Sequence, residues 1–428
     1  LIGCGTALNN PSWQVTVGDL VTKSELPAAV SVNSMGFNMM RSVGPAAGGA
    51  IVAAFGAAAA FAVNAASYVA IIAALFAWKS KPRASRLPRE RFGSAFAAGL
   101  RYVALSPNLV RTIARAFLFG LSAIALQALL PVIVRNGLGG TSFIYGVLLG
   151  AFGIGAVFGA MASKRLRDRF ENEAIIRIGF GGYAICYLAL ALSPPVVIAG
   201  AVLFLGGACW VLTLSLLNTT IQLSTPRWVV GRVLALYQTG TFGGMAAGSW
   251  IWGALAEANG MSVALISASV AMGVGLAFGK LAPLPDRAEM RLDPANTFVE
   301  PELSLDIQPQ SGPVMVIVDF IIDEADVPRF LDLMADRRRI RIRDGAGHWT
   351  LLRDMEKPDK WSESYHVPTW VEYIRHHERR TEADIENFQK LRALHRGPEP
   401  IGVHRMIERH SVSELRTTPG RRGNTPSQ

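Results

Sequence analysis

The stretch GFNMMRSVGPAAGG, from Gly36 to Gly49, decides how the first half of this chain is interpreted. It lies in an apolar run from about Val30 to Trp78, which is too long for one membrane crossing of roughly 20 residues. Pro45 removes a helical hydrogen bond, and the glycines around it let another helix approach closely. Arg41 places a charge where charge is costly. The stretch predicts either a gating helix or a plain helix–helix contact whose arginine reaches the membrane surface.

Composition divides the chain into two parts. Of the 428 residues 50% are hydrophobic and 17% charged, whereas an ordinary soluble domain has about 25% charged residues. Residues 1–283 hold 20 Lys and Arg against 7 Asp and Glu, and residues 284–428 hold 22 against 25. Basic charge between long apolar runs is typical of cytoplasmic membrane loops and not of a nucleic-acid footprint. The three cysteines lie in apolar runs, so no disulfide framework or metal spacing is present.

Apolar segments of near-spanning length recur along residues 1–284. The first run ends near Trp13, and the long second run splits near Phe55–Ala57 into two crossings. The others lie at about 109–134, 143–163, 174–192, 196–223, 229–256 and 261–284. The sequence thus predicts nine crossings.

The loop charges predict one orientation for these crossings. The loop at 164–177 carries five basic residues and the loop at 224–232 carries two, whereas the connections between them are almost uncharged. By the positive-inside rule the basic loops, the connector at 79–101 and the C-terminal region are cytoplasmic. In that connector Phe92, Phe96, Leu100 and Val103 follow helical spacing, which predicts an amphipathic helix on the membrane surface.

A faint internal repeat links the two ends of the apolar region. Gly44, Ala46, Ala47 and Gly48 match Gly244, Ala246, Ala247 and Gly248 at an offset of 200. A duplicated half-transporter leaves a repeat of this size. The four glycines at 150, 153, 155 and 159 superficially suggest a dinucleotide fingerprint, but they lie in an apolar helix without a preceding strand, so we interpret them as helix-packing residues.

The GPAAGG motif, the basic connector and the repeat together resemble the major facilitator superfamily, and most closely its drug-efflux and siderophore-exporter (enterobactin exporter-like) branch. Gly44, Pro45, Gly48 and Gly49 match the core of that branch's antiporter motif, although Met40 stands where the family has a glycine. The loop Gly159–Arg169 resembles the second-half copy of the family's gating loop. The acid–base positions of that loop correspond to Asp168 and Arg169, and the branch also has an equivalent of Arg232.

The resemblance implies twelve helices in two bundles, with alternating access to a central substrate site. Leu1 then falls in helix four, so that three helices precede this sequence. Our first hypothesis is proton-coupled efflux of small amphipathic molecules, drug-like or siderophore-like, across the cytoplasmic membrane, without a cofactor or metal. Arg41 is the candidate functional charge. Candidates for the substrate pathway are the polar residues within the apolar runs: Asn38, Asn64, Gln127, Asn218, Gln222 and Gln238.

The last third of the chain has a different pattern. After a proline-containing linker at 284–312, the residues at 313–412 predict strands at 314–322, 348–355, 361–370 and 401–409 and helices at 325–338 and 371–394. This βαββαβ order predicts a small α+β ferredoxin-like domain, followed by a disordered tail at 413–428. It resembles the cofactor-free monooxygenases of antibiotic biosynthesis, which implies a dimerisation surface.

Function in this domain stays open between two interpretations. One is a pocket for an aromatic ligand or haem, lined by His366, His376, His377, Trp349, Trp361 and Trp370. The other is that His376 and His377 lie on the exposed face of a charged helix while the tryptophans pack the sheet. The second hypothesis for the whole chain is therefore a membrane-tethered enzyme or ligand-binding module, and a third is a transporter with a regulatory domain.

Overall fold

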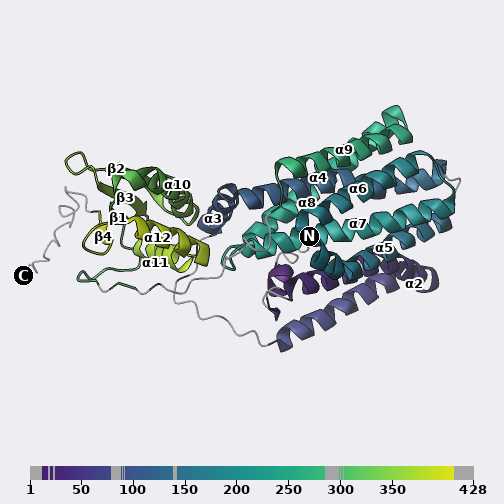
Figure 1. Ribbon diagram of the computed structural model, residues 1–428. Coiled ribbons are helices and arrows are strands. Elements are labelled where there is room, and N and C mark those ends of the chain that lie inside the picture. Colours follow the sequence, from purple (N-terminus) through teal and green to yellow (C-terminus); the bar gives the residue numbers. More distant parts are fainter. Residues whose placement is uncertain are drawn as a thin grey trace, which may run out of the picture. The chain divides into compact units, whose positions relative to one another are not determined.

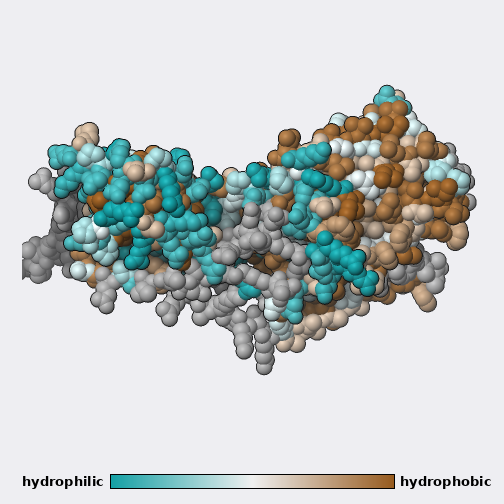
Figure 2. All heavy atoms as spheres, viewed as in Figure 1, coloured by the Kyte–Doolittle hydropathy of each residue, from teal (hydrophilic) through white to brown (hydrophobic). Residues whose placement is uncertain are grey.

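The computed structural model describes residues 12–408, apart from 18–19, 23–24, 79–87, 89, 91, 138–141, 285–297, 299 and 302 (Figure 1). The chain divides into two compact units, Leu1–Pro294 with Thr381–Ala383 and Ala295–Arg380 with Asp384–Gln428. We call them the helical unit and the C-terminal unit. The helical unit has a largely hydrophobic surface over its helices, and the C-terminal unit a largely hydrophilic one (Figure 2).

Helix α2 (Leu26–Ala77) contains the GPAAGG stretch and bends at one residue. Gly56 has φ 80° and ψ 169°, a conformation that side chains with a Cβ rarely adopt. The predicted division near Phe55–Ala57 is therefore confirmed. The second part, Ala58–Ala77, is long and apolar enough to span a membrane, and none of its spanning window is buried among the described residues.

Helix α3 (Phe92–Ala104) has the two-faced character predicted for the connector. Phe92, Phe96 and Leu100 are exposed, whereas Ala98 and Tyr102 are buried against the unit. An exposed apolar row on a short helix beside basic sequence fits a helix that lies in a membrane interface. Most of the basic residues of the connector lie outside the described residues.

Six further helices form a bundle in the helical unit: α4 (Pro107–Val132), α5 (Ser142–Arg169), α6 (Asn172–Ala191), α7 (Val196–Leu223), α8 (Val230–Asn259) and α9 (Met261–Leu281). Helix α5 packs on α7, α4 on α8, and α6 on both α7 and α9. Pro131 lies inside α4, and the chain continues as a π-helical turn at Ile133–Gly137. A proline that cannot donate its hydrogen bond is a known cause of such irregular helix ends.

Within the described residues, six helical segments are long and apolar enough to cross a membrane: Ala58–Ala77, Pro107–Arg135, Phe143–Arg169, Asn172–Ala191, Val196–Leu223 and Met261–Leu281. Helix α8 occupies the predicted crossing at 229–256 but is less apolar than this criterion demands. The first predicted crossing lies largely outside the described residues. The total of nine crossings therefore stays a prediction.

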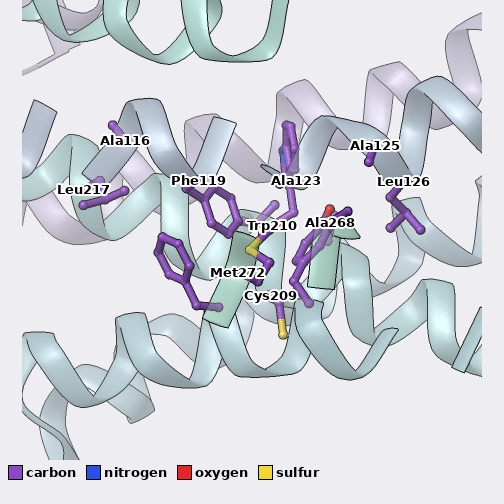
Figure 3. Packing of buried hydrophobic residues seen from close by; sticks show 14 of the residues in the cluster. Ala116, Phe119, Ala123, Ala125, Leu126, Cys209, Trp210, Leu217, Ala268 and Met272 are labelled. Atoms are coloured by element: carbon purple, nitrogen blue, oxygen red, sulfur yellow. The ribbon is translucent and has the colours of Figure 1, made fainter. Parts of the chain in front are cut away.

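The centre of the bundle is packed with aromatic side chains (Figure 3). Phe119 of α4 contacts the rings of Phe180, Tyr183 and Trp210, with ring centroids 5.2, 5.6 and 6.1 Å away. The Tyr187 hydroxyl donates a 2.6 Å hydrogen bond to the carbonyl of Ser122. Phe119, Phe180, Tyr183 and Tyr187 are fully buried, so the six-helix bundle has a close-packed core around these rings.

Close backbone contacts replace side chains between α5 and α7. A Cβ placed on Gly155 would lie 1.9 Å from the carbonyl oxygen of Phe204, and one on Gly159 would lie 2.5 Å from that of Ala208. Gly207 meets the carbonyl of Phe152 in the same way, at 1.9 Å. Gly155 and Gly159 are thus helix-packing residues as predicted, because any larger residue would force the two helices apart. The prediction is wrong for Gly150, where an added Cβ would have no atom within 4 Å.

The C-terminal unit is built on a four-stranded antiparallel sheet in the order β2-β3-β1-β4. Its strands are β1 (Val314–Ile321), β2 (Gly347–Arg353), β3 (Lys360–Val367) and β4 (Gly402–Ile407). Side chains of β1 alternate between buried and half-buried, with Phe320 completely covered. Helix α10 (Val327–Arg343) contributes Phe330 to the same core, its ring 5.5 Å from that of Phe320.

One helix of this unit differs from the prediction. The stretch predicted as a single helix at 371–394 forms α11 (Trp370–Glu378) and α12 (Glu382–Leu394). Thr369 starts α11 by accepting a hydrogen bond from the backbone N–H of Glu372. The sequence TEAD at 381–384 has the residue types of a second helix start, a signal that the periodicity of apolar residues does not reveal.

Candidate functional site

The predicted antiporter motif lies inside α2, whose backbone is helical there. The side chains of six predicted site residues fall outside the described ones: Asn38, Arg41, Gly44, Pro45, Gly48 and Gly49. Their roles in gating and substrate passage stay predictions.

The repeat partner of the motif is described in full on α8. A Cβ on Gly244 would lie 2.4 Å from the carbonyl oxygen of Phe117 in α4, and one on Gly248 would lie 2.1 Å from that of Leu121. The Trp252 indole donates a 2.6 Å hydrogen bond to the same Leu121 carbonyl. In the second half, therefore, this glycine pair lets two helices meet backbone to backbone.

A cluster of three serines and one arginine joins α2 to the bundle. Arg167, near the end of α5, is buried and donates a 3.0 Å hydrogen bond to the hydroxyl of Ser31 in α2. The Ser31 hydroxyl also lies 3.4 Å from that of Ser163 and 3.3 Å from that of Ser215 in α7. We call Ser31, Ser163, Arg167 and Ser215 the serine–arginine cluster. It is a buried polar contact between three helices in an otherwise apolar unit.

A second polar contact lies one helical turn further along α7. The Asn218 amide donates a 2.8 Å hydrogen bond to Gln14, in the short helical stretch 12–17. Asn218 accepts a 2.6 Å hydrogen bond from the amide of Gln222. These three side chains form an amide ladder. Two of the residues predicted for the substrate pathway are thus brought together by the four-residue period of the helix and joined to a segment about 200 positions away.

The two gating-loop residues predicted on α5 differ in exposure from the buried Arg167. Asp168 and Arg169 are exposed, and it is their neighbour Arg167 that enters the interior. Successive residues on a helix point in directions about 100° apart, so only one of three can face the bundle. Arg232, also predicted, pairs with Glu90 at 2.7 Å and joins the connector to α8.

Three other predicted pathway residues lie on α2, α4 and α8. Gln127 on α4 and Gln238 on α8 are half-buried, and Asn64 is exposed on the second part of α2. Their role in the pathway stays a prediction.

The sequence analysis missed one ion pair inside the helical unit. The buried Arg115 of α4 donates hydrogen bonds of 2.5 and 3.2 Å to the two carboxylate oxygens of Glu173 in α6. Glu173 also accepts from Arg177 and from the backbone N–H of Leu284. A Cβ on Gly279 of α9 would lie 2.4 Å from a Glu173 oxygen, so a third helix closes over the pair. An arginine within the run at 109–134 was the available signal, because charge in an apolar segment is rare without a partner.

All of these contacts fall at one end of the helices. Arg167, Asn218 and Gln222 lie near the ends of α5 and α7, whereas Ser31, Arg115 and Glu173 lie near the starts of α2, α4 and α6. Helices that run up and down alternately bring such ends together, and in the predicted orientation this end is cytoplasmic. The serine–arginine cluster lies at this end of the interface between α2 and the bundle, and the Arg115–Glu173 pair lies at the same end between α4 and α6.

In the C-terminal unit, the expectation that His376 and His377 are solvent-exposed is wrong. Both are buried, with 2% and 8% of their surface exposed. The Arg341 guanidinium lies 2.9 Å from the His376 ring, and the His377 ring packs 4.2 Å from that of Tyr373. The cause is the early end of α11, which makes it a short helix lying on the core instead of part of a long surface helix.

The six residues predicted to share a ligand pocket do not converge on one site. Trp370 stacks on Tyr373, Trp349 donates a 3.1 Å hydrogen bond to Glu363, and His366 lies near His348. Only His376 among the six lines the pocket described below. The tryptophans at 361 and 370 are buried side chains of the sheet core, as the packing interpretation predicted.

A buried cluster around Glu363 was not predicted. This β3 carboxylate has no exposed surface and accepts hydrogen bonds of 2.7 Å from Arg337 and 3.1 Å from Arg341. Burial alone would raise the pKa of Glu363, but the attraction of both guanidiniums and their hydrogen bonds outweigh it and lower the pKa to about 2. Glu363 is therefore ionised at neutral pH and bridges α10 to the sheet.

Comparison with known proteins gives one family match over nearly the whole chain. A family model described as "Transmembrane secretion effector" matches residues 1–413. The matched range includes the C-terminal unit as well as the helical unit. A search of curated proteins found no match.

Proposed function

Because the chain belongs to the transmembrane secretion effector family of major facilitator transporters, we propose that it exports small amphipathic molecules, drug-like or siderophore-like, from the cell. The export is coupled to proton entry and proceeds by alternating access across the cytoplasmic membrane, with the C-terminal unit in the cytoplasm. Small-molecule transport through a lipid bilayer follows from the family. Substrate class, direction and proton coupling are our proposal, supported by the resemblance and by the charge pattern of the loops.

The serine–arginine cluster is the observation that carries the proposal. The centre of the six-helix bundle is filled by Phe119, Trp210 and their neighbours, so a substrate passes beside the bundle and not through it. The polar groups lie where α2 meets α5 and α7. A buried arginine at a helix interface is costly unless that interface opens or is hydrated during function.

In the proposed cycle the cluster is a cytoplasmic gate. With Arg167 bonded to Ser31, and Asn218 to Gln14, the cytoplasmic ends of the first segments and the bundle are held together. Opening toward the cytoplasm exchanges these bonds for bonds to water, which costs little because each group stays solvated. Gate closure and opening are then close in free energy, as a transporter with two alternating states requires.

Glu173 has a structural role in this proposal. Its carboxylate accepts hydrogen bonds from Arg115, Arg177 and the backbone N–H of Leu284. These bonds join α4 and α6 to the chain segment that follows α9. Proton coupling rests on the resemblance and is tested separately.

The gate is tested by comparing two arginines of the same helix. Arg167→Ala removes the buried contact, whereas Arg165→Ala removes an exposed charge of equal sign. We expect Arg167→Ala to lower the rate of dye export by about tenfold or more, since a hydrogen bond to a charged group stabilises by about 1.5–3 kcal/mol. Arg165→Ala should retain the normal rate, and both proteins should reach the membrane in equal amounts. Equal rates for the two variants would remove the gate from the proposal.

Direction and coupling are measured in inside-out membrane vesicles. Uptake of a fluorescent amphipathic dye or an iron-chelating catecholate into these vesicles corresponds to export from the cell. We expect uptake to require a proton gradient in which the vesicle interior is acidic. Uptake should stop when a protonophore collapses this gradient. Uptake that persists without the gradient would exclude proton coupling while leaving export intact.

A further inference from the structure

The C-terminal unit contains a small pocket between α10, α11 and α12. It is lined by Arg337, Ile340, Arg341, Asp344, His376, Arg380, Asp384, Ile385 and Phe388. The cavity volume is about 20 Å³, too small for an aromatic ring or a haem, so only the charged end of a small ligand can enter it. Three of the nine lining residues are arginines, so the pocket suits a small, negatively charged group.

Two of these arginines are already neutralised in part. Arg337 and Arg341 share the single carboxylate of Glu363, so two positive charges face one negative charge. The Arg341 guanidinium also lies 4.3 Å above the Tyr365 ring. This contact and the bonds to Glu363 hold Arg341 in place at the pocket wall.

The two acids of the pocket are occupied by a different arginine. Arg343 donates to Asp384 over 2.9 Å and to Asp344 over 2.9 Å. Both carboxylates are buried, and both pair with Arg343, which does not line the pocket.

Arg380 is the positive charge that remains. Among the residues that the structure describes, no carboxylate forms an ion pair with it. Burial and the neighbouring charge of Arg341 lower the pKa of Arg380 to about 10, the direction expected for a cation without a counter-ion. An oxyanion in the pocket would supply that counter-ion and could accept two parallel hydrogen bonds from a guanidinium.

His376 forms part of the same pocket wall. An arginine can only donate, so Nε2 of His376 is the acceptor in its contact with Arg341, and the ring proton of the neutral histidine is on Nδ1. Burial first, and the charge of Arg341 second, lower the pKa of His376 well below its usual value, which keeps the ring neutral. The Nδ1 proton faces the backbone carbonyl of Asp344, so the His376 ring is held between Arg341 and that carbonyl at the pocket wall.

We propose that the pocket formed by Arg337, Arg341, His376 and Arg380 binds the oxyanion group, carboxylate or phosphate, of a small acidic ligand. Arg380 supplies the uncompensated charge. Glu363 positions Arg341 and Arg337. The C-terminal unit then acts as a ligand-sensing module attached to the transporter. This assignment does not depend on the transported substrate, because the pocket lies wholly within the C-terminal unit.

Binding is measured by isothermal titration calorimetry on the full chain in nanodiscs of neutral phosphatidylcholine. The probes are inorganic phosphate and acetate, at constant ionic strength. We expect saturable binding of at least one probe, weakened tenfold or more by Arg380→Gln and restored in part by Arg380→Lys. The matched control is Arg339→Gln, which removes an equal charge from the exposed face of α10, where Arg339 pairs with the exposed Asp336.

The same titrations distinguish a lipid headgroup from a soluble ligand. If phosphatidylglycerol in the nanodisc reduces binding of the free probe, the oxyanion in the pocket belongs to a lipid headgroup. Binding in neutral nanodiscs without such competition identifies a soluble ligand. The proposal is overturned if neither probe nor the anionic lipid binds in a way that Arg380→Gln weakens, or if Arg339→Gln weakens binding as much. Hydrogen exchange of α10 peptides without ligand shows whether Arg380→Gln leaves the unit folded.

Discussion

The two units bury arginine–glutamate pairs in different ways. In the helical unit one guanidinium, Arg115, meets one carboxylate, Glu173, with two oxygens accepting from two nitrogens. In the C-terminal unit two guanidiniums, Arg337 and Arg341, share Glu363, and none of the described carboxylates forms an ion pair with the nearby Arg380. The first arrangement is complete in itself and joins helices. The second has surplus positive charge and a cavity beside it. The comparison teaches that burial of a balanced pair does not by itself indicate function, whereas a positive charge left over beside a cavity supports the proposed anion site.

The largest expected effect is at Glu363. Glu363→Gln leaves two buried guanidiniums without a counter-ion, and we expect a loss of about 4–5 kcal/mol in the stability of the C-terminal unit. Hydrogen exchange of β3 peptides in the full chain measures this. The control Glu386→Gln removes an exposed partner of Lys390 and should change stability by less than about 1 kcal/mol. An equally small effect of Glu363→Gln would mean that water or relaxation compensates the buried charges.

A smaller loss is expected in the helical unit. Glu173→Gln leaves one buried guanidinium, Arg115, without its counter-ion. Because the Glu173 side chain retains 13% exposure, we expect the free energy of unfolding to fall by about 3 kcal/mol. The thermal midpoint of the detergent-purified protein measures the loss. The double variant Arg115→Met, Glu173→Met should recover most of it, because no unpaired charge is then buried. Failure of the double variant to recover would show that the pair also has a role besides helix packing.

The smallest expected effect is on the acid sensitivity of the C-terminal unit. Burial, and next the charge of Arg380, lower the pKa of His377 to about 2, whereas the unfolded chain titrates near 6.5. Between these two pH values His377 is protonated in the unfolded state and neutral in the folded state. As the pH falls below 6.5, His377 therefore lowers the free energy of unfolding by about 1.4 kcal/mol per pH unit. Glu363, with a folded pKa of about 2, loses its contribution only below about pH 4.5.

Asp344, whose pKa is raised by burial, acts in the opposite direction as it is protonated, so the contribution of His377 is taken from the difference between variants. Urea midpoints from pulse proteolysis measure the slope of stability against pH between pH 6.5 and 4.5. His376, buried beside His377, contributes in the same direction as His377. His377→Gln should reduce the slope by about 1.4 kcal/mol per pH unit. The control His404→Gln changes an exposed residue of β4 and should leave the slope unchanged. An unchanged slope in His377→Gln would contradict the assignment of the acid sensitivity to this ring.

The sequence predicted several features because they depend on local chemistry. The bend at Gly56, the surface helix at Phe92 and the order of strands and helices in the C-terminal unit all follow from spacing, glycine and apolar periodicity. Gly155 and Gly159 could be interpreted correctly because small residues in an apolar helix have few other uses. The division between α11 and α12 was missed because its only signal is a helix start, TEAD, within a continuous amphipathic pattern.

Partnerships across the chain could not be predicted. Arg167 and Asp168 are neighbours in sequence, and only the angle at which α5 meets α2 and α7 decides that Arg167 is the buried one. Arg115 and Glu173 are 58 residues apart, and no local pattern relates them.

By itself, the sequence determined that residues 1–284 form apolar helices with basic loops and that a mixed α+β unit follows, because hydropathy and periodicity act over a few turns of chain. The tertiary structure alone decided which charges are paired and which are left over. That decision depends on how several helices approach one another within a few ångströms, where the strength of each electrostatic contact is set by distance and burial and not by position in the chain.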